Sequence, residues 1–112
     1  MTTYTATFST GETITRNSDN TYAFAWAVIR IEDGKIIDKG FSADRANAAK
    51  AAQSRMWSGV SARDRKNPAL RRYHARIAKD NGFATVQAWF DAREAEAAER
   101  NAAHRIEIVE VA

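Results

Sequence analysis

The sequence predicts an α+β protein in which strands come first, helices follow and one further strand ends the chain. Three observations predict this class. The first forty residues alternate apolar and polar side chains with the period of strands, two later stretches carry helix-forming residues, and the final RIEIVEVA returns to strand-like residues. We expect a four-stranded antiparallel meander covered on one face by an alanine-rich helix, then a helical hairpin and a C-terminal strand.

Polar or glycine-containing breaks separate the four strands of the expected meander, which cover residues 3–9, 12–17, 22–32 and 35–41. Gly11 follows the first strand in a turn and can adopt a positive φ. Asp33-Gly34 is the signal of a tight hairpin between the last two strands. The C-terminal strand, residues 105–112, is expected to pair at an edge of this sheet or with a second subunit.

The strongest strand reads YAFAWAVIRI and places Tyr22, Phe24 and Trp26 on one face, with three alanines on the other. An aromatic row of this kind is either a platform for nucleic-acid bases or the floor of a core. If exposed, three rings of about 150–250 Å² each would form a patch at or above the roughly 300–600 Å² found on typical monomers. We therefore expect the row to be core, and Ala23, Ala25 and Ala27 to lie on the outer face.

The stretch ADRANAAKAAQSRMW lacks β-branched residues and predicts a helix after the fourth strand. Ser42 is the expected N-cap, and Asp44 in the first turn suits the helix dipole. Ala49, Ala52 and Met56 recur at helical spacing, so they form the expected apolar stripe against the sheet.

Residues 58–66 read as a linker, and a helical hairpin follows at residues 67–104. Asn67 caps its first helix, and Pro68 occupies the first helical position. The predicted apolar face of that helix consists of Leu70, Tyr73, His74 and Ile77. Asn81-Gly82 stops the helix, and the second helix starts near Thr85. The spacing departs from that of a helix-turn-helix because Asp91 falls at an expected apolar anchor, so an ordinary hairpin is favoured.

Length and composition bound the class of protein. At 112 residues the chain is one domain, divided into residues 1–57, 67–104 and 105–112. It has no cysteine and no apolar run long enough to span a membrane. The stretch MTTYTATFST lacks the charged and apolar regions of a signal peptide, so we expect a cytoplasmic protein without one. The formal net charge is +3, and its distribution is uneven.

Positive charge gathers on a basic segment, residues 63–79, whereas the following helix is acidic. The candidate partner-binding residues are Arg63, Arg65, Lys66, Arg72, Arg76 and Lys79. The last three lie at i, i+4 and i+7, so they share one helix face. Three readings stay open: contact with phosphates, contact with an acidic protein surface, or a solvated face that pairs internally with Asp91, Glu94 and the other acids.

No catalytic, cofactor or metal motif is recognisable. His74 and His104 are thirty residues apart without a partner motif. Asp33, Asp38 and Asp44 are near in sequence, but they belong to a turn, a strand and a helix start. We therefore expect a protein that is not an enzyme and has no cofactor or metal.

The stretches TYTATFSTGETITRNSDNTYAFAWAV and GFSADRANAAKAAQ, a Thr-rich hairpin followed by an Ala-rich helix, resemble small accessory proteins of phages and mobile elements. Among these, the anti-CRISPR inhibitors of bacterial defence have a comparable α+β build. The resemblance covers about the first fifty-five residues and implies a non-enzymatic protein that acts by binding in the host cytosol. It carries over no functional residue.

These observations lead to three functional hypotheses. The first is an inhibitor that docks on a nucleic-acid-processing complex of the host, of the CRISPR-Cas type, and occludes a nucleic-acid or protein binding site. The second is a protein that binds DNA or RNA directly through the basic segment. The third is a homodimeric structural protein that uses the C-terminal strand or the helix pair as its interface.

Overall fold

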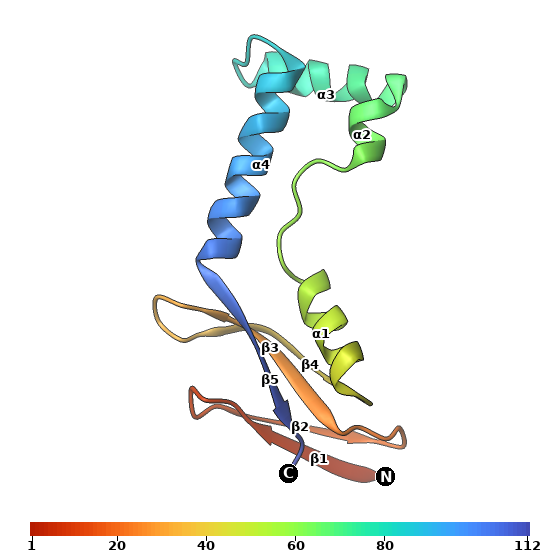
Figure 1. Ribbon diagram of the computed structural model, residues 1–112, viewed down its shortest axis with the longest axis vertical. Coiled ribbons are helices and arrows are strands. Elements are labelled where there is room, and N and C mark those ends of the chain that lie inside the picture. Colours follow the sequence, from red (N-terminus) through yellow and green to blue (C-terminus); the bar gives the residue numbers. More distant parts are fainter. The chain divides into compact units, whose positions relative to one another are not determined.

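The computed structural model describes residues 1–112 and divides the chain into two compact units (Figure 1). The sheet unit comprises residues 1–56 and 103–112, and the helical unit comprises residues 57–102. The sheet unit contains β1 (Thr2–Thr7), β2 (Thr13–Ser18), β3 (Phe24–Arg30), β4 (Ile36–Ser42), α1 (Arg45–Ser54) and β5 (His104–Glu110). The helical unit contains α2 (Ala62–Lys66), α3 (Pro68–Asp80) and α4 (Val86–Ala102). This confirms the predicted α+β class.

The expected four-stranded meander is wrong in one respect, because the strands form two sheets. β3 is the centre of a three-stranded antiparallel sheet of order β4-β3-β5, and β1 and β2 form a separate hairpin. Phe24 pairs with both Ser42 and Glu110, so β5 takes the edge of β3 that β4 leaves free. The C-terminal strand therefore pairs within its own chain.

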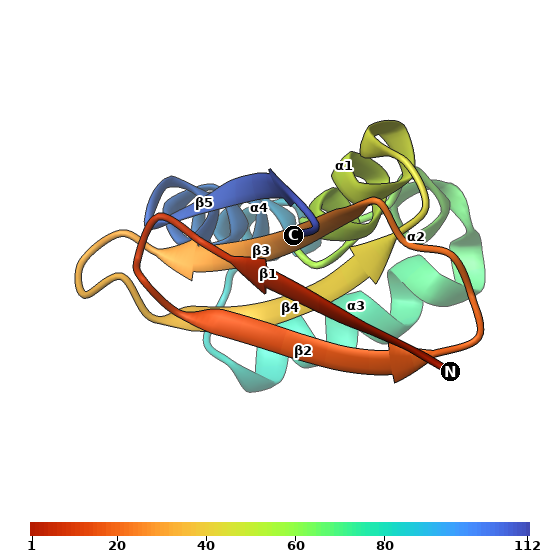
Figure 2. The same ribbon diagram turned by 90° about the horizontal axis from the view of Figure 1, so that it is seen from below.

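The hairpin of β1 and β2 lies across one face of the three-stranded sheet (Figure 2). Its buried residues Ala6, Phe8 and Ile14 pack with Ala25, Ala27 and Ile29 of β3. The expectation that the alanines of β3 form an outer face is therefore wrong. Alanine is suited to this position because a small side chain lets the hairpin approach the sheet closely.

α1 covers the opposite face of the sheet, as predicted. Trp26 and Val28 are buried there together with Ala48 and Ala52 of α1, which confirms that this part of the aromatic row is core. Burying each of the larger side chains contributes about 1.5–3 kcal/mol. Since both faces of β3 are covered, Ala25 to Ile29 are buried without interruption.

The observed packing of the sheet unit differs from the prediction in two details. Tyr22 precedes β3 and packs edge-on against Tyr4, with ring centroids 5.1 Å apart, so it lies on the hairpin side and not with Trp26. The N-cap of α1 is Asp44, whose carboxylate accepts from the Asn47 N–H at 2.7 Å, rather than Ser42. The helix therefore begins later than expected, and Ala49 is exposed.

A hydrogen-bonded carboxylate joins the hairpin turn to β5. Glu107 accepts from the Ser9 N–H at 2.7 Å and from the Ser9 hydroxyl, and Arg105 donates to it at 3.2 Å. Burial by itself would raise the pKa of Glu107, but the hydrogen bonds from Ser9 and Arg105 outweigh it and hold the pKa below its ordinary value.

In the helical unit, local signals predicted the helix ends well. The Asn67 side chain accepts from the Ala69 and Leu70 N–H groups, and Pro68 begins α3. Gly82 has φ +82° after the end of α3, and the Thr85 hydroxyl accepts from the Ala88 N–H at the start of α4. No helix of the protein is both long and apolar enough to cross a membrane.

The segment read as a linker contains a helix of its own. Ser61 caps α2, and its hydroxyl accepts from the Asp64 N–H at 3.1 Å. The loop assigned to Arg63, Arg65 and Lys66 is thus helical, because a capping serine with an acid at the third position favours a first turn.

Candidate binding surface on the helical unit

A single large side chain, Phe90 of α4, forms the centre of the helical unit and is 0% exposed. The His74 ring of α3 meets it edge-on at 5.4 Å. The guanidinium groups of Arg65 and Arg71 lie 5.3 Å and 5.6 Å from its ring centroid. Cations over a ring face are attracted by its quadrupole. Two of the cations of α2 and α3 therefore contribute to the packing of the helical unit.

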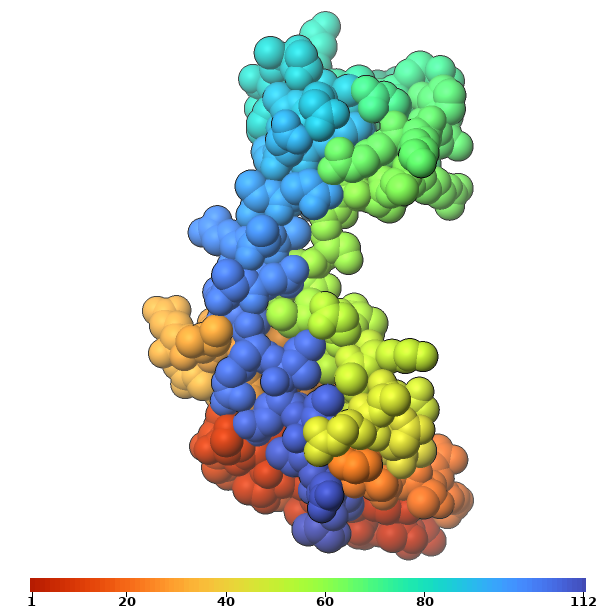
Figure 3. All heavy atoms as spheres, in the orientation of Figure 1, coloured from red at the N-terminus to blue at the C-terminus, as the bar shows by residue number.

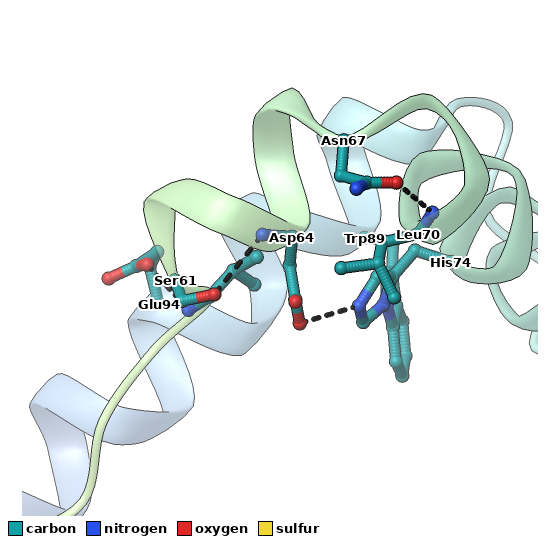
Figure 4. Close-up of polar contacts among 8 residues, drawn as sticks. Ser61, Asp64, Asn67, Leu70, His74, Trp89 and Glu94 are labelled. Atoms are coloured by element: carbon teal, nitrogen blue, oxygen red, sulfur yellow. Dashed lines mark hydrogen bonds and ion pairs between the residues drawn. The ribbon is translucent and has the colours of Figure 1, made fainter.

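His74 is held from both sides by hydrogen bonds, to Asp64 and to Trp89. The contact with Asp64 is drawn in Figure 4. Trp89 Nε1–H donates to His74 Nδ1 at 3.3 Å, so Nδ1 is the unprotonated nitrogen. The other nitrogen, Nε2, then carries the proton and donates to the Asp64 carboxylate at 3.0 Å. The three residues connect α2, α3 and α4, so the position of α3 is defined by polar contacts as well as by packing.

Arg65 is the one predicted partner-binding residue that is engaged internally. It donates to the Glu94 carboxylate at 2.9 Å, and the Val60 N–H donates to the same oxygen at 2.8 Å. The Arg65 hydrogen bond is the main reason that the pKa of Glu94 lies below its ordinary value. Of the three hypotheses that the sequence left open for these cations, pairing with an acid of the same protein is therefore correct for Arg65.

Gly59 allows the Glu94 carboxylate to approach the segment before α2. Gly59 was not identified as important from the sequence. A Cβ atom added to it would overlap the carboxylate of Glu94. The approach of two segments thirty-five residues apart leaves no local signal, because glycine in a linker is common for many reasons.

Five predicted cations form no ion pair and are exposed: Arg63, Lys66, Arg72, Arg76 and Lys79. We call these five residues the basic surface. They lie on α2 and α3, two helices that pack against each other with only Asn67 between them in the sequence. The spheres of this part of the chain are green in Figure 3. Arg72, Arg76 and Lys79 share the exposed face of α3, as their spacing predicts.

The acidic residues near the basic surface are mostly occupied. Asp64 accepts from His74, Glu94 accepts from Arg65, and Asp91 accepts from the Gln87 side chain at 2.9 Å. Asp80, at the end of α3, is exposed and forms no ion pair. The groups that donate to Asp64 and Asp91 are neutral, so three carboxylates here, with Asp80, are not paired with lysine or arginine. The five unpaired cations outnumber them, and the surface keeps a net positive charge.

Tyr73 follows Arg72 in the sequence, lies about 60° around the helix axis from Arg76, and is 58% exposed. The sequence placed it on the apolar face of α3, which is wrong. The ring faces solvent because Leu70, His74 and Ile77 already fill the side of α3 that packs on α4. Its only ring neighbour is His74, at 5.6 Å and 73°.

The residues considered for catalysis have structural partners. Asp33 accepts two hydrogen bonds from Arg30, which hold its pKa at about 2. Asp38 pairs with Arg55 at 3.5 Å, and Asp44 caps α1. His104 is the first residue of β5. No three histidine, aspartate or glutamate side chains are grouped so that they could hold a metal ion.

A hollow of about 430 Å³ lies in the sheet unit and is lined in part by Tyr4, Tyr22 and Phe24. The Tyr4 hydroxyl donates to the Asn20 carbonyl at 2.7 Å, and the Asn20 amide donates to the Tyr22 hydroxyl at 3.4 Å. Both phenols are thus used within the fold, and the hollow presents no converging set of reactive groups.

Comparisons with protein-family models, with curated proteins and with solved structures found no match to this chain.

Proposed function

We propose that this protein is a non-enzymatic binding protein that docks on an anionic partner through the basic surface. The observation that carries the proposal is the division of the cations of α2 and α3. Arg65 contacts Phe90 and Glu94 and Arg71 contacts Phe90, whereas the five cations of the basic surface form no ion pair within the protein. An uncompensated patch of one sign attracts ligands of the opposite sign and accelerates their association.

The biological setting that we propose is inhibition of a nucleic-acid-processing complex, as the resemblance to anti-CRISPR proteins implies. A positive surface is repelled by the positive groove in which such a complex holds its nucleic acid. Occlusion would therefore result from binding to the nucleic acid itself or to an acidic patch beside it, and not from imitation of nucleic acid.

The test is capture of a defence complex from a host lysate by the wild type and by the Arg72→Glu/Arg76→Glu variant. The matched control is Lys39→Glu/Lys50→Glu, which makes the same change in net charge at two exposed lysines of the sheet unit. We expect capture to be lost with the first variant and retained with the control. Equal capture by both variants would overturn the assignment of the basic surface, and equal loss would show that only net charge matters.

A further inference from the structure

We infer that the anionic ligand of the basic surface is single-stranded nucleic acid, with Tyr73 as the residue on which a base stacks. This inference rests on the proposed function, since it names the partner of the same surface. The observation behind it is the position of Tyr73, an aromatic ring that is 58% exposed among the cations of α3.

The cations of α3 are spaced to contact successive phosphates. Arg72 and Arg76 are one turn apart, about 6 Å along the helix axis, and Lys79 lies about one further turn away. At about 100° per residue, Tyr73 lies at the edge of this row of cations, about 60° around the helix axis from Arg76, and it is exposed as they are. A strand that crosses α3 can thus place its phosphates on the cations while one base covers the ring.

The ring favours a single strand over two other anionic partners. In a duplex the bases are already stacked on each other, so an exposed tyrosine on a helix face finds no free base surface. Tyrosine is also common at protein–protein interfaces, but Tyr73 is the one large exposed hydrophobic side chain of the helical unit, so it has no apolar neighbours with which to form the core of such an interface. Single strands combine a charged backbone with unstacked bases, and proteins bind them with cations interleaved with aromatic rings.

The ring of Tyr73 is supported from within the unit. It contacts the His74 ring, which is held by Asp64 on one side and Trp89 on the other. A ring on a supported helix loses less conformational freedom on binding than one on a loop, and such preorganisation increases affinity.

The experiment measures binding of the full chain to fluorescein-labelled oligo(dT) by fluorescence anisotropy, at several salt concentrations. The comparison strands are an abasic oligonucleotide of the same length, which keeps the phosphates and lacks the bases, and the matching duplex. The variants are Tyr73→Ala, Tyr73→Phe and Arg72→Glu/Arg76→Glu, with Lys39→Glu/Lys50→Glu as the control.

For the wild type we expect salt-dependent binding of oligo(dT), with a log–log slope of about −3.5 if all five cations contact phosphates. Tyr73→Ala is expected to weaken binding of oligo(dT) roughly 5- to 150-fold. It should leave the salt slope and the affinity for the abasic strand unchanged, because it removes no phosphate contact. Tyr73→Phe keeps the ring and should retain the affinity.

Two results would overturn the inference and leave the proposed function standing. If Tyr73→Ala binds oligo(dT) as the wild type does, while Arg72→Glu/Arg76→Glu loses binding, the surface binds phosphate without base stacking. If the wild type binds no oligo(dT) at low salt but still captures a complex through Arg72 and Arg76, the partner is an acidic protein. Unchanged helix content and melting temperature of each variant, by circular dichroism, exclude misfolding as the cause.

Discussion

The interiors of the two units are stabilised in different ways. The sheet unit has two clusters of buried apolar side chains, one on each face of β3. The helical unit buries Phe90, Ala78 and Ala97, and around Phe90 it places the cations and ring contacts of α2 and α3. A small unit with one large buried side chain depends on directional contacts, and charges that these contacts do not use remain available at its surface.

The largest expected effect comes from removing the centre of the helical unit. Phe90→Ala should cost about 3–5 kcal/mol, because it leaves a cavity and deprives Arg65, Arg71 and His74 of their shared contact. Residue-resolved hydrogen exchange should show faster exchange in α3 and α4. The matched change in the sheet unit is Ile29→Ala, expected to cost about 2–5 kcal/mol and to affect β3 and β5. Equal acceleration in both units by either variant would show that the two units are one cooperative structure.

In the sheet unit, Gly40→Ala is expected to cost about 1–3 kcal/mol, the usual range for overpacking. Gly40 pairs with Trp26, and an added Cβ would lie 2.7 Å from the indole Nε1. Urea denaturation measures the loss. The double variant Gly40→Ala/Trp26→Leu tests the cause, since a smaller side chain makes room and the two losses should be less than additive.

In the helical unit, Asp64→Ala is expected to cost about 1–2 kcal/mol, because His74 Nε2–H loses its acceptor at a site where the His74 side chain is 17% exposed. Thermal denaturation measures the change. Asp64→Asn keeps an acceptor oxygen and should recover most of the stability. A loss with Asn as large as with Ala would show that the carboxylate charge matters more than the hydrogen bond.

The smallest effect concerns the dependence of the sheet unit on pH. The folded-state pKa of Glu107 lies below its unfolded value, so the ionised carboxylate contributes stability above the ordinary glutamate pKa of about 4.3. That contribution is lost as the pH falls through the lower, folded-state pKa. Glu107→Gln should cost about 1 kcal/mol at neutral pH and should flatten the acid side of the stability curve. An unchanged acid slope would exclude Glu107 as its source.

Most features set by short stretches of sequence were predictable from the sequence, although the Ser61 cap of α2 and the Asp44 cap of α1 were missed. Asn67 and Thr85 fix the starts of α3 and α4, because their side chains accept hydrogen bonds from neighbouring N–H groups. Pro68 suits the first helical position, and Gly82 follows the end of α3 with a positive φ. The helix and strand periods likewise gave the element order and the α+β class. Such signals are contained within a few residues, so no knowledge of the rest of the chain is needed.

Features set by distant pairs could not be predicted in the same way. The alanines of β3 read as an outer face, since nothing near them shows that the β1–β2 hairpin covers them. The sequence likewise predicted six cations as partner-binding residues without distinguishing them. Only Arg65 among the six forms an ion pair, and its partner Glu94 is twenty-nine residues away. The predicted position of Tyr73 on the apolar face was wrong for a related reason, because the side of α3 that faces inward depends on how α4 packs against it.

One contact near the boundary of the helical unit has a consequence for how the protein folds. The Asn101 side chain accepts from the Trp57 N–H at 2.9 Å and donates to the Trp57 carbonyl at 2.8 Å. This double hydrogen bond joins the two ends of the inserted segment that separates α1 from β5. Once it forms, β5 behaves as though a short loop, and not a whole helical unit, preceded it, so the entropy lost in returning β5 to β3 is smaller. The helical unit, with its basic surface, therefore adds little to the entropic barrier to completing the sheet.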